Sequence, residues 1–468
     1  MLNGVPFLYP DSFVYFSYGT SAWEHLGDLV ALDSAPEPQP AAAAVQGGAG
    51  KELAAAATSG KVESDSSWTP LAGRSIYYGV LAGLPGLIEA PWTGALLQSY
   101  CAAVVVAIAW REAVGRPGVA YLAAMAAFGL FTTFGIFAST AMPDVWAGLS
   151  ILSVAVLVAY RHSLHRFDAV VLWAFVLFAT LVHSSHLALL VALGLGLAVA
   201  RLAGAATLPW SMMAKMGAIA VVAVLLSAGG KAVLERAAGK DLLGLPFFTA
   251  HLVDGGPGTD FARDRCPEVS FAVCERADQL PVEWREFLFR FSGSVAYQRR
   301  LVAEDRAFAL ATLRHDPLAV AALAVRDAVR QVAKIGLVTT PIRDETIRGW
   351  SVERSYSSLA ERMRAGRLYE ANWLYRAVSL ANTVLVIAGL AGLAVLLLRR
   401  DRPGSELRTL LTVSGASILL NAAICGVLAS PYDRFQARVA WLIPVLLVIA
   451  LAHWWSRPTG NRATETPG

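Results

Sequence analysis

Apolar residues along the chain are gathered into nine segments, and polar and charged residues are concentrated between them. A helix needs about 20 apolar residues to cross the hydrocarbon core of a bilayer, and most of the segments approach that length. The segments run over residues 93–110, 118–138, 145–160, 168–184, 186–202, 212–229, 376–398, 408–428 and 437–455. Because they lack the alternation of apolar and polar residues that membrane barrels show, helices are predicted. The pattern predicts an all-α polytopic membrane protein with about nine transmembrane helices.

Composition agrees with this class. Hydrophobic residues make up 56% of the 468 residues and charged residues only 16%, and the mean hydropathy is +0.51. A soluble domain cannot bury so large an apolar fraction. The net charge of +4 comes largely from Arg residues in the predicted loops. We therefore expect membrane lipids, and no nucleic acid, among the partners.

The predicted orientation follows from the short loops, because loops rich in Lys and Arg stay cytoplasmic. Under strict alternation, five loops or tails with basic residues fall on one side: Arg111, Arg116, Arg161, Arg166, Arg201, Lys215, Arg399, Arg400, Arg402, Arg408, Arg457 and Arg462. That side is predicted to be the cytoplasm and includes the tail 457–468. Residues 1–92 and 230–375 then lie on the periplasmic face of a bacterial inner membrane.

The N-terminal region is predicted to be an outer loop over residues 1–92. Nothing in residues 1–30 is apolar enough to carry it across. Either the N-terminus is translocated unaided, or a signal-like helix belongs before the present Met1, which we favour. Residues 34–67 have few large apolar side chains and are predicted to be a disordered spacer. Residues 75–92 are apolar but broken by Pro and Gly, which favours an interfacial helix.

The remaining chain divides into three parts. Transmembrane helices one to six are predicted over 93–229, and helices seven to nine over 376–456. Residues 230–375 have the mixed charge of a soluble domain, and residues 297–336 show helical spacing typical of a cap packed on the bundle. Cys266 and Cys274 lie in this domain, where an oxidising periplasm favours a disulfide, although two free thiols are the alternative.

Two acidic residues follow prolines on the predicted outer side. Asp11 lies in Tyr9-Pro10-Asp11-Ser12 among aromatic residues, where a carboxylate could act as a general base near the lipid headgroups. Asp144 repeats the pattern in Met142-Pro143-Asp144. The alternative for each is a helix N-cap, and the two roles are compatible.

His183 and His186 are three residues apart at a predicted membrane exit. With Asp11 or Asp144 they could bind a divalent metal, and the alternative is a structural or substrate-contact role. We predict no other cofactor.

Arg434 and Arg438, together with Tyr432, lie on the side that otherwise avoids positive charge. Guanidinium groups beside a span suggest a bound anion such as a lipid phosphate. The alternative pairs Arg434 with Asp433 and lets Arg438 reach the headgroups. Arg74, before the interfacial segment, is a weaker candidate of the same kind.

Together these features resemble the GT-C superfamily of membrane glycosyltransferases. The resemblance rests on Asp11 in an outer loop, Arg74-Ser75-Ile76-Tyr77-Tyr78 entering a juxtamembrane helix, Asp144, and a large periplasmic portion. The chain as a whole more closely resembles uncharacterised bacterial multi-pass membrane proteins.

The resemblance implies an inverting transfer of a sugar from a polyprenyl-phosphate carrier to an envelope glycan, lipid or protein acceptor. Asp11 would be the base or orient the acceptor, Asp144 would assist the acceptor or a metal, and Arg434 and Arg438 would hold the carrier phosphate. Two other functions remain open: a lipid or solute transporter or flippase, and a non-catalytic envelope assembly protein. The spans contain few ionisable residues near their centres, which argues against ion coupling.

Overall fold

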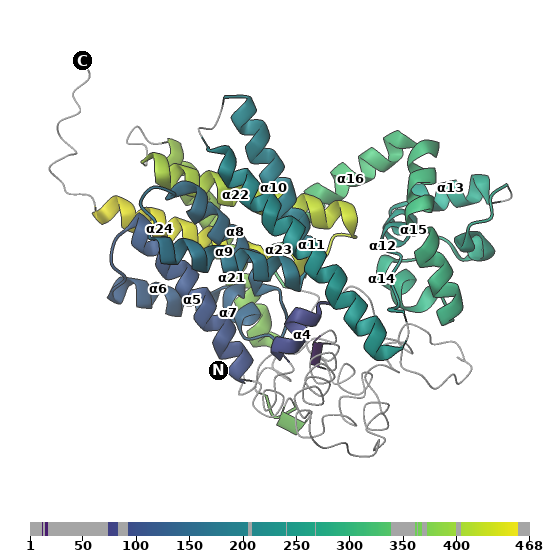
Figure 1. The fold of residues 1–468 in the computed structure, drawn as a ribbon, viewed down its shortest axis with the longest axis horizontal. Coiled ribbons are helices and arrows are strands. Elements are labelled where there is room, and N and C mark those ends of the chain that lie inside the picture. Colours follow the sequence, from purple (N-terminus) through teal and green to yellow (C-terminus); the bar gives the residue numbers. More distant parts are fainter. Residues whose placement is uncertain are drawn as a thin grey trace.

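A computed structural model describes residues 12, 15–16, 74–82, 92–204, 208–239, 241–266, 268–337, 361–362, 364–366, 372–398 and 404–456. Asp11, the predicted spacer 34–67 and residues 83–91 of the predicted interfacial segment lie outside the described residues. The regular elements of the described ranges are helices (Figure 1). The prediction of an all-helical polytopic membrane protein is confirmed.

The helices form an apolar bundle and a smaller domain. The bundle helices are α4 (Ile76–Ala82), α5 (Trp92–Ala113), α6 (Val119–Phe131), α7 (Thr133–Ala138), α8 (Val145–Ala159), α9 (Arg166–Val182), α10 (Ser184–Leu202), α11 (Trp210–Ala238), α21 (Asn372–Leu398), α22 (Ser405–Leu428), α23 (Asp433–Ala440) and α24 (Leu442–Ser456). The domain helices are α12 (Phe247–Gly255), α13 (Pro257–Arg265), η1 (Ala272–Gln279), α14 (Trp284–Glu286), η2 (Phe287–Phe291), α15 (Val295–His315) and α16 (Pro317–Val332).

Six described helical segments are long and apolar enough to cross a membrane, or seven if the bent pair α15 and α16 counts as one span. The six are Trp92–Ala113, Ser184–Leu202, Trp210–Arg236, Tyr375–Leu398, Ser405–Leu428 and Asp433–Ser456. The predicted segment 118–138 is divided between α6 and α7. The break falls at Thr132, whose hydroxyl donates to the Phe128 carbonyl at 2.6 Å and accepts the Phe134 N–H at 3.2 Å. The Thr132 side chain thus bonds to the last turn of α6 and caps the start of α7.

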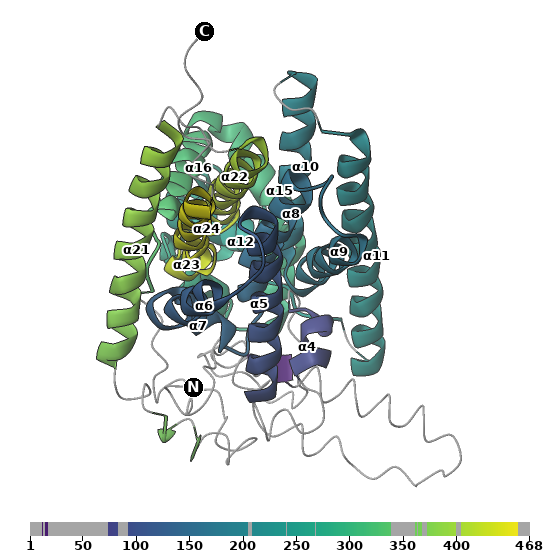
Figure 2. The same ribbon diagram turned by 90° about the vertical axis from the view of Figure 1, so that its left-hand side faces the viewer.

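Helix α8 lies at the centre of the bundle. All 15 of its residues are buried, and it packs against α5, α9, α22 and α23. Figure 2 shows α21 and α11 at opposite edges of the bundle. These two peripheral helices expose apolar side chains such as Leu225 and Ile387, as lipid-facing helices do.

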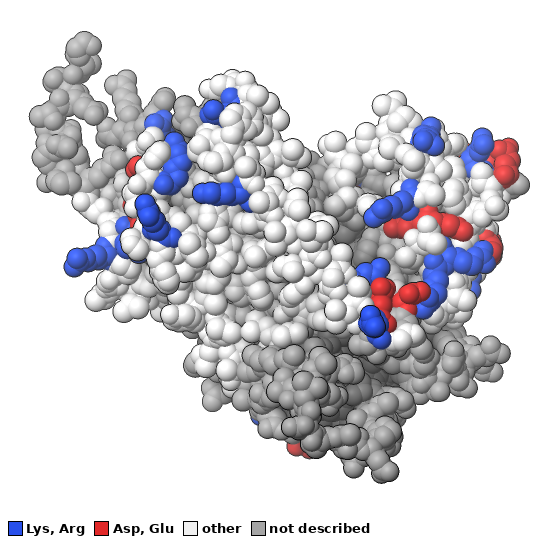
Figure 3. Space-filling model, viewed as in Figure 1, with Lys and Arg blue, Asp and Glu red and all other residues white. Residues whose placement is uncertain are grey.

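Two hydrogen bonds show that α5 and α8 run in the same direction. At one end the Gln98 amide donates to the Thr140 carbonyl at 2.9 Å, and at the other the Ser163 hydroxyl donates to Glu112 at 3.0 Å. The second end also carries Arg111, ion-paired with Asp168. In Figure 3, Lys and Arg side chains gather at one end of the apolar body, whereas the domain carries both signs. The assignment of the basic end to the cytoplasm stays a prediction.

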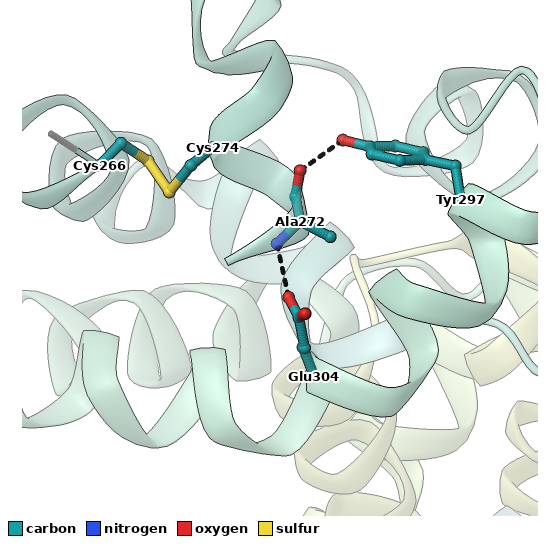
Figure 4. The surroundings of a disulfide bond; sticks show 5 residues. All are labelled: Cys266, Ala272, Cys274, Tyr297 and Glu304. Atoms are coloured by element: carbon teal, nitrogen blue, oxygen red, sulfur yellow. Dashed lines mark hydrogen bonds between the residues drawn. A yellow bond between two sulfur atoms is a disulfide. The ribbon is translucent and has the colours of Figure 1, made fainter. Parts of the chain in front are cut away.

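The domain has its own aromatic core, formed largely by Phe261, Phe287, Phe291 and Phe308. Cys266 and Cys274 form a disulfide, with Cα atoms 5.2 Å apart (Figure 4), so the alternative of two free thiols is wrong.

The disulfide loop is tied to α15 through the backbone of Ala272. Its N–H donates to Glu304 at 2.5 Å, and its carbonyl accepts the Tyr297 hydroxyl at 2.7 Å. The predicted helical stretch 297–336 covers all of α16 and nearly all of α15, which are bent by 110° relative to each other. The bend falls at Asp316, whose carboxylate caps α16 by accepting the Ala319 N–H at 2.8 Å.

Candidate functional site

Asp144 lies at the N-terminus of α8, but its carboxylate makes no capping hydrogen bond. Its side chain is 1% exposed, and Oδ1 lies 3.2 Å from Arg434 Nε and 3.7 Å from Arg438 Nη1. The interpretation of Asp144 as a helix cap is therefore wrong. A buried carboxylate that two guanidinium groups approach is held by charge and not by helix geometry.

Both arginines come from α23, one helical turn apart and therefore on the same face. Arg438 is fully buried, so the alternative in which it reaches the headgroups is wrong. Its Nη2 donates to Ser185 Oγ at 2.9 Å and to Asn421 Oδ1 at 3.2 Å. The sulfur of Cys425 also lies 3.4 Å from this nitrogen.

Arg434 is oriented by its neighbour. The carboxylate of Asp433 accepts the backbone N–H of Arg434 at 2.8 Å, while the guanidinium contacts Asp144. This backbone hydrogen bond does not involve the Arg434 guanidinium, so the pairing of the Arg434 and Asp433 side chains stays a prediction.

The two histidines meet the arginines through Ser185. His183 Nδ1 lies 2.8 Å from Ser185 Oγ, so the hydroxyl that accepts from Arg438 can donate to His183. The imidazoles of His183 and His186 stack with centroids 5.1 Å apart. His186 Nδ1 lies 2.9 Å from the Ala179 carbonyl, which requires a proton on that nitrogen. A continuous polar chain therefore runs from Asp144 through Arg438 and Ser185 to His183.

Electrostatic interactions extend this cluster to Arg74 and to α4. His183 lies between α9 and α10, and its pKa is lowered well below the usual value by burial, by His186, and by the positive charges of Arg438, Arg74 and Arg434. Burial, and then Tyr15 and Asp144, raise the pKa of Tyr78 on α4. The ring of Tyr78 also contacts Tyr15, with centroids 4.8 Å apart.

Several buried atoms of this neighbourhood make no hydrogen bond in the described part of the chain: Arg438 Nε and Nη1, Asp144 Oδ2 and His186 Nε2. Because buried donors are normally satisfied, unsatisfied guanidinium N–H groups favour an anionic ligand.

Within the described residues, no group of three or more His, Cys, Asp or Glu side chains could hold a metal ion. The positive charges beside His183 also oppose a cation. A site that includes Asp11 lies outside the described residues, so the choice between a metal and a structural or substrate-contact role for the histidines stays a prediction.

Tyr432 is set apart from the cluster. Its backbone N–H donates to Gln331 Oε1 at 2.8 Å, and its carbonyl accepts from Gln331 Nε2 at 2.9 Å. Its ring contacts Phe435, with centroids 5.7 Å apart, and Arg285 lies 5.6 Å above it. These contacts put Tyr432 at the junction with the domain, so its predicted role in phosphate binding gains no support from them.

The sequence singled out six residues of this cluster: Asp144, Arg434, Arg438, His183, His186 and Arg74. It did not indicate three further contacts of Arg438. Ser185, Asn421 and Cys425 surround its guanidinium. One signal was available, because Asn421 is an amide in an apolar span and such residues seek a polar partner.

Comparisons with models of protein families, with curated proteins and with solved structures return no match for this chain.

Proposed function

We propose that this chain is a GT-C-type membrane glycosyltransferase. It transfers a sugar from a polyprenyl-phosphate carrier to an envelope acceptor on the periplasmic face, with inversion. The observation that carries the proposal is the convergence of Arg434 and Arg438 on buried Asp144. Planar guanidinium groups bind phosphate oxygens through paired N–H bonds. A carboxylate beside them can accept a hydrogen bond from an acceptor hydroxyl.

The proposed reaction is a single displacement. The acceptor oxygen attacks the anomeric carbon, and the bond from that carbon to the phosphate oxygen breaks with its electron pair on the phosphate. Arg434 and Arg438 stabilise this leaving group, and electrostatic stabilisation of developing charge is commonly the largest catalytic effect. The hydroxyl proton passes to a carboxylate. We assign that step to Asp11, which lies outside the described residues, and we assign orientation of the acceptor to Asp144.

The proposal includes about nine membrane crossings, with the domain and the cluster on the same, periplasmic side. Helices α8 and α9 are shorter than the candidate spans. The bonds from Gln98 to Thr140 and from Ser163 to Glu112 support a crossing by α8, because they bring its two ends level with positions near the two ends of α5. The complete burial of α8 also supports it, since a helix surrounded by protein need not match the bilayer thickness.

The experiment measures transfer of radiolabelled sugars from polyprenyl-phosphate donors to an envelope-lipid extract by the purified full chain in liposomes. We expect Asp144→Asn to lower transfer by about 100-fold, the usual cost of losing one electrostatic contact to a transition state. Asp11→Asn should lower it similarly.

The matched control is Asp168→Asn. Asp168 also pairs with an arginine, at 2.7 Å from Arg111 Nη2, but near the opposite end of α9. Asp168 lies about 22 Å along α9 from the end of the helix at His183, where the cluster is. Transfer by the control should stay at the wild-type level. Equal transfer by Asp144→Asn and wild type would remove Asp144 from the reaction. No transfer by any protein, with every donor tried, would contradict the function itself and favour a transporter or an assembly protein.

A further inference from the structure

Helix α16 buries Asp327 and Gln331 beside Leu323, and it turns several large apolar side chains outward. Asp327 is 3% exposed and Gln331 is fully buried. On the outer face, Leu318 is 81% exposed, and Val325 and Val329 are each 66% exposed. A helix on a water-soluble domain shows the opposite arrangement, with its apolar stripe facing the core.

The outward residues form one continuous stripe. Leu318, Val325, Val329 and Val332 are spaced by seven, four and three positions, which places them on one side of a helix. Leu310 and Leu313, near the end of α15, are also exposed. Together α15 and α16 are apolar enough for a membrane segment, although bent by 110°. A contiguous apolar patch of this kind marks a contact surface.

The inner face of α16 packs directly on α22, which is a candidate span. The two backbones nearly touch at Gly426, where an added Cβ would lie 2.6 Å from the Asp327 carbonyl oxygen and 2.9 Å from Ala328 Cα. In the next positions α22 exposes Val427 (36%) and Leu428 (42%). The exposed surface of α16 therefore adjoins the exposed apolar surface of a transmembrane helix.

We propose that α16 lies in the lipid leaflet on the domain side of the membrane, with the stripe Leu318, Val325, Val329 and Val332 against acyl chains. Arg326 and Arg330 support this occupant. Their side chains are 44% and 62% exposed, and each pairs with Asp327, at 3.0 and 3.6 Å. Basic side chains beside an apolar helix face reach lipid phosphates from this depth. The proposal rests on the exposed apolar face of α16 and is independent of the proposed enzymatic activity.

The test measures the surroundings of nitroxide labels on single cysteines in the full chain reconstituted in liposomes. The background carries Cys101→Ala and Cys425→Ala, because these are the free thiols, and keeps the disulfide. Labels are placed by Val325→Cys and, separately, Val329→Cys. The lipid control is Leu225→Cys on α11, also 66% exposed, and the water control is Asp260→Cys on α13, whose side chain is 68% exposed.

Collision rates are measured with oxygen, which concentrates in lipid, and with a water-soluble nickel chelate. We expect the oxygen-to-nickel ratio at both α16 labels to match that of the Leu225→Cys label. A ratio equal to that of the Asp260→Cys label would overturn the proposal, because the stripe would then face water. Low collision rates with both reagents would also overturn it, since the stripe would then be covered by protein, such as a second copy of the chain.

Discussion

Removing two members of the buried charge cluster together should destabilise the bundle by less than the sum of the two separate losses. The chosen changes are Asp144→Leu, Arg438→Leu and the double variant. Asp144 and Arg438 are 1% and 0% exposed, and their charged atoms lie 3.7 Å apart. Unit charges about 4 Å apart attract by about 4 kcal/mol at an effective dielectric constant of about 20. Loss of one partner from a buried pair typically costs about 3–5 kcal/mol, because the other charge stays buried.

The losses in free energy of unfolding should differ between the two single variants, because the two changes leave different groups unpaired. Arg438→Leu also deprives Ser185 and Asn421 of a donor, whereas Asp144→Leu leaves two guanidinium groups without their shared carboxylate. We expect each single variant to lose at least about 3 kcal/mol. The double variant should lose less than their sum by about 1–3 kcal/mol, the usual coupling between residues in contact.

The assay is unfolding of the purified chain in mixed detergent micelles, followed by circular dichroism. Free energies of unfolding from the wild type and three variants form a double-mutant cycle. A matched cycle on Arg111 and Asp168, whose pair is more exposed, should show coupling below about 1 kcal/mol. Strictly additive losses at Asp144 and Arg438 would refute the reasoning, because the two charges would then not interact.

Three further predictions concern the domain and its junction with the bundle. Gly426→Ala should destabilise the chain by about 1–3 kcal/mol in the same unfolding assay, because the new Cβ meets the α16 backbone; Gly415→Ala, with nothing within 4 Å, should not. Replacing Cys266 and Cys274 together by Ser should cost the domain about 2–3 kcal/mol, the chain-entropy value for a loop this short, and thermal unfolding with and without reductant checks it. Burial lowers the pKa of His251 in the folded chain, so as pH falls the imidazole is protonated in the unfolded chain before it is in the folded chain. Stability should therefore fall as pH drops below about 6.5. His251→Asn should reduce this dependence of stability on pH.

Much of the fold could be predicted because apolar length and loop charge are local properties of the chain. The segments found from hydropathy correspond to described helices, of which six or seven, and not nine, are candidate spans. Two features of the bundle were not predicted. The first is Thr132, where side-chain hydrogen bonds interrupt a continuous apolar run. The second is α8, whose complete burial could not be foreseen. Lipid is as apolar as a protein core, so apolar residues do not reveal which helix faces which medium.

The charged residues of the candidate site could be predicted from the sequence, but the contacts between them could not. Asp144, Arg434 and Arg438 stood out because ionisable groups next to spans are costly. Their convergence required α8 and α23 to pack together, which one sequence does not encode locally. Ser185 carries no local signal of its own, because a hydroxyl is common at helix starts and its contact with Arg438 spans 253 positions of sequence. The spacing over residues 297–336 predicts a helical cap packed on the bundle, and α16 does pack on α22, but the spacing does not reveal that apolar residues of α16 face outward.

The measurement that tests the central claim most directly is binding of polyprenyl phosphate, compared with uncharged polyprenol, to the purified chain. Arg438→Lys keeps the charge but loses the planar pair of N–H donors. We expect wild type to prefer the phosphate, and Arg438→Lys to lower its affinity by about 10- to 100-fold, the value of one or two charge-assisted hydrogen bonds. Arg111→Lys, at the opposite end of the bundle, should bind as wild type does. Equal phosphate affinity in all three proteins, or no preference over polyprenol, would contradict the assignment of Arg434 and Arg438 to a lipid phosphate.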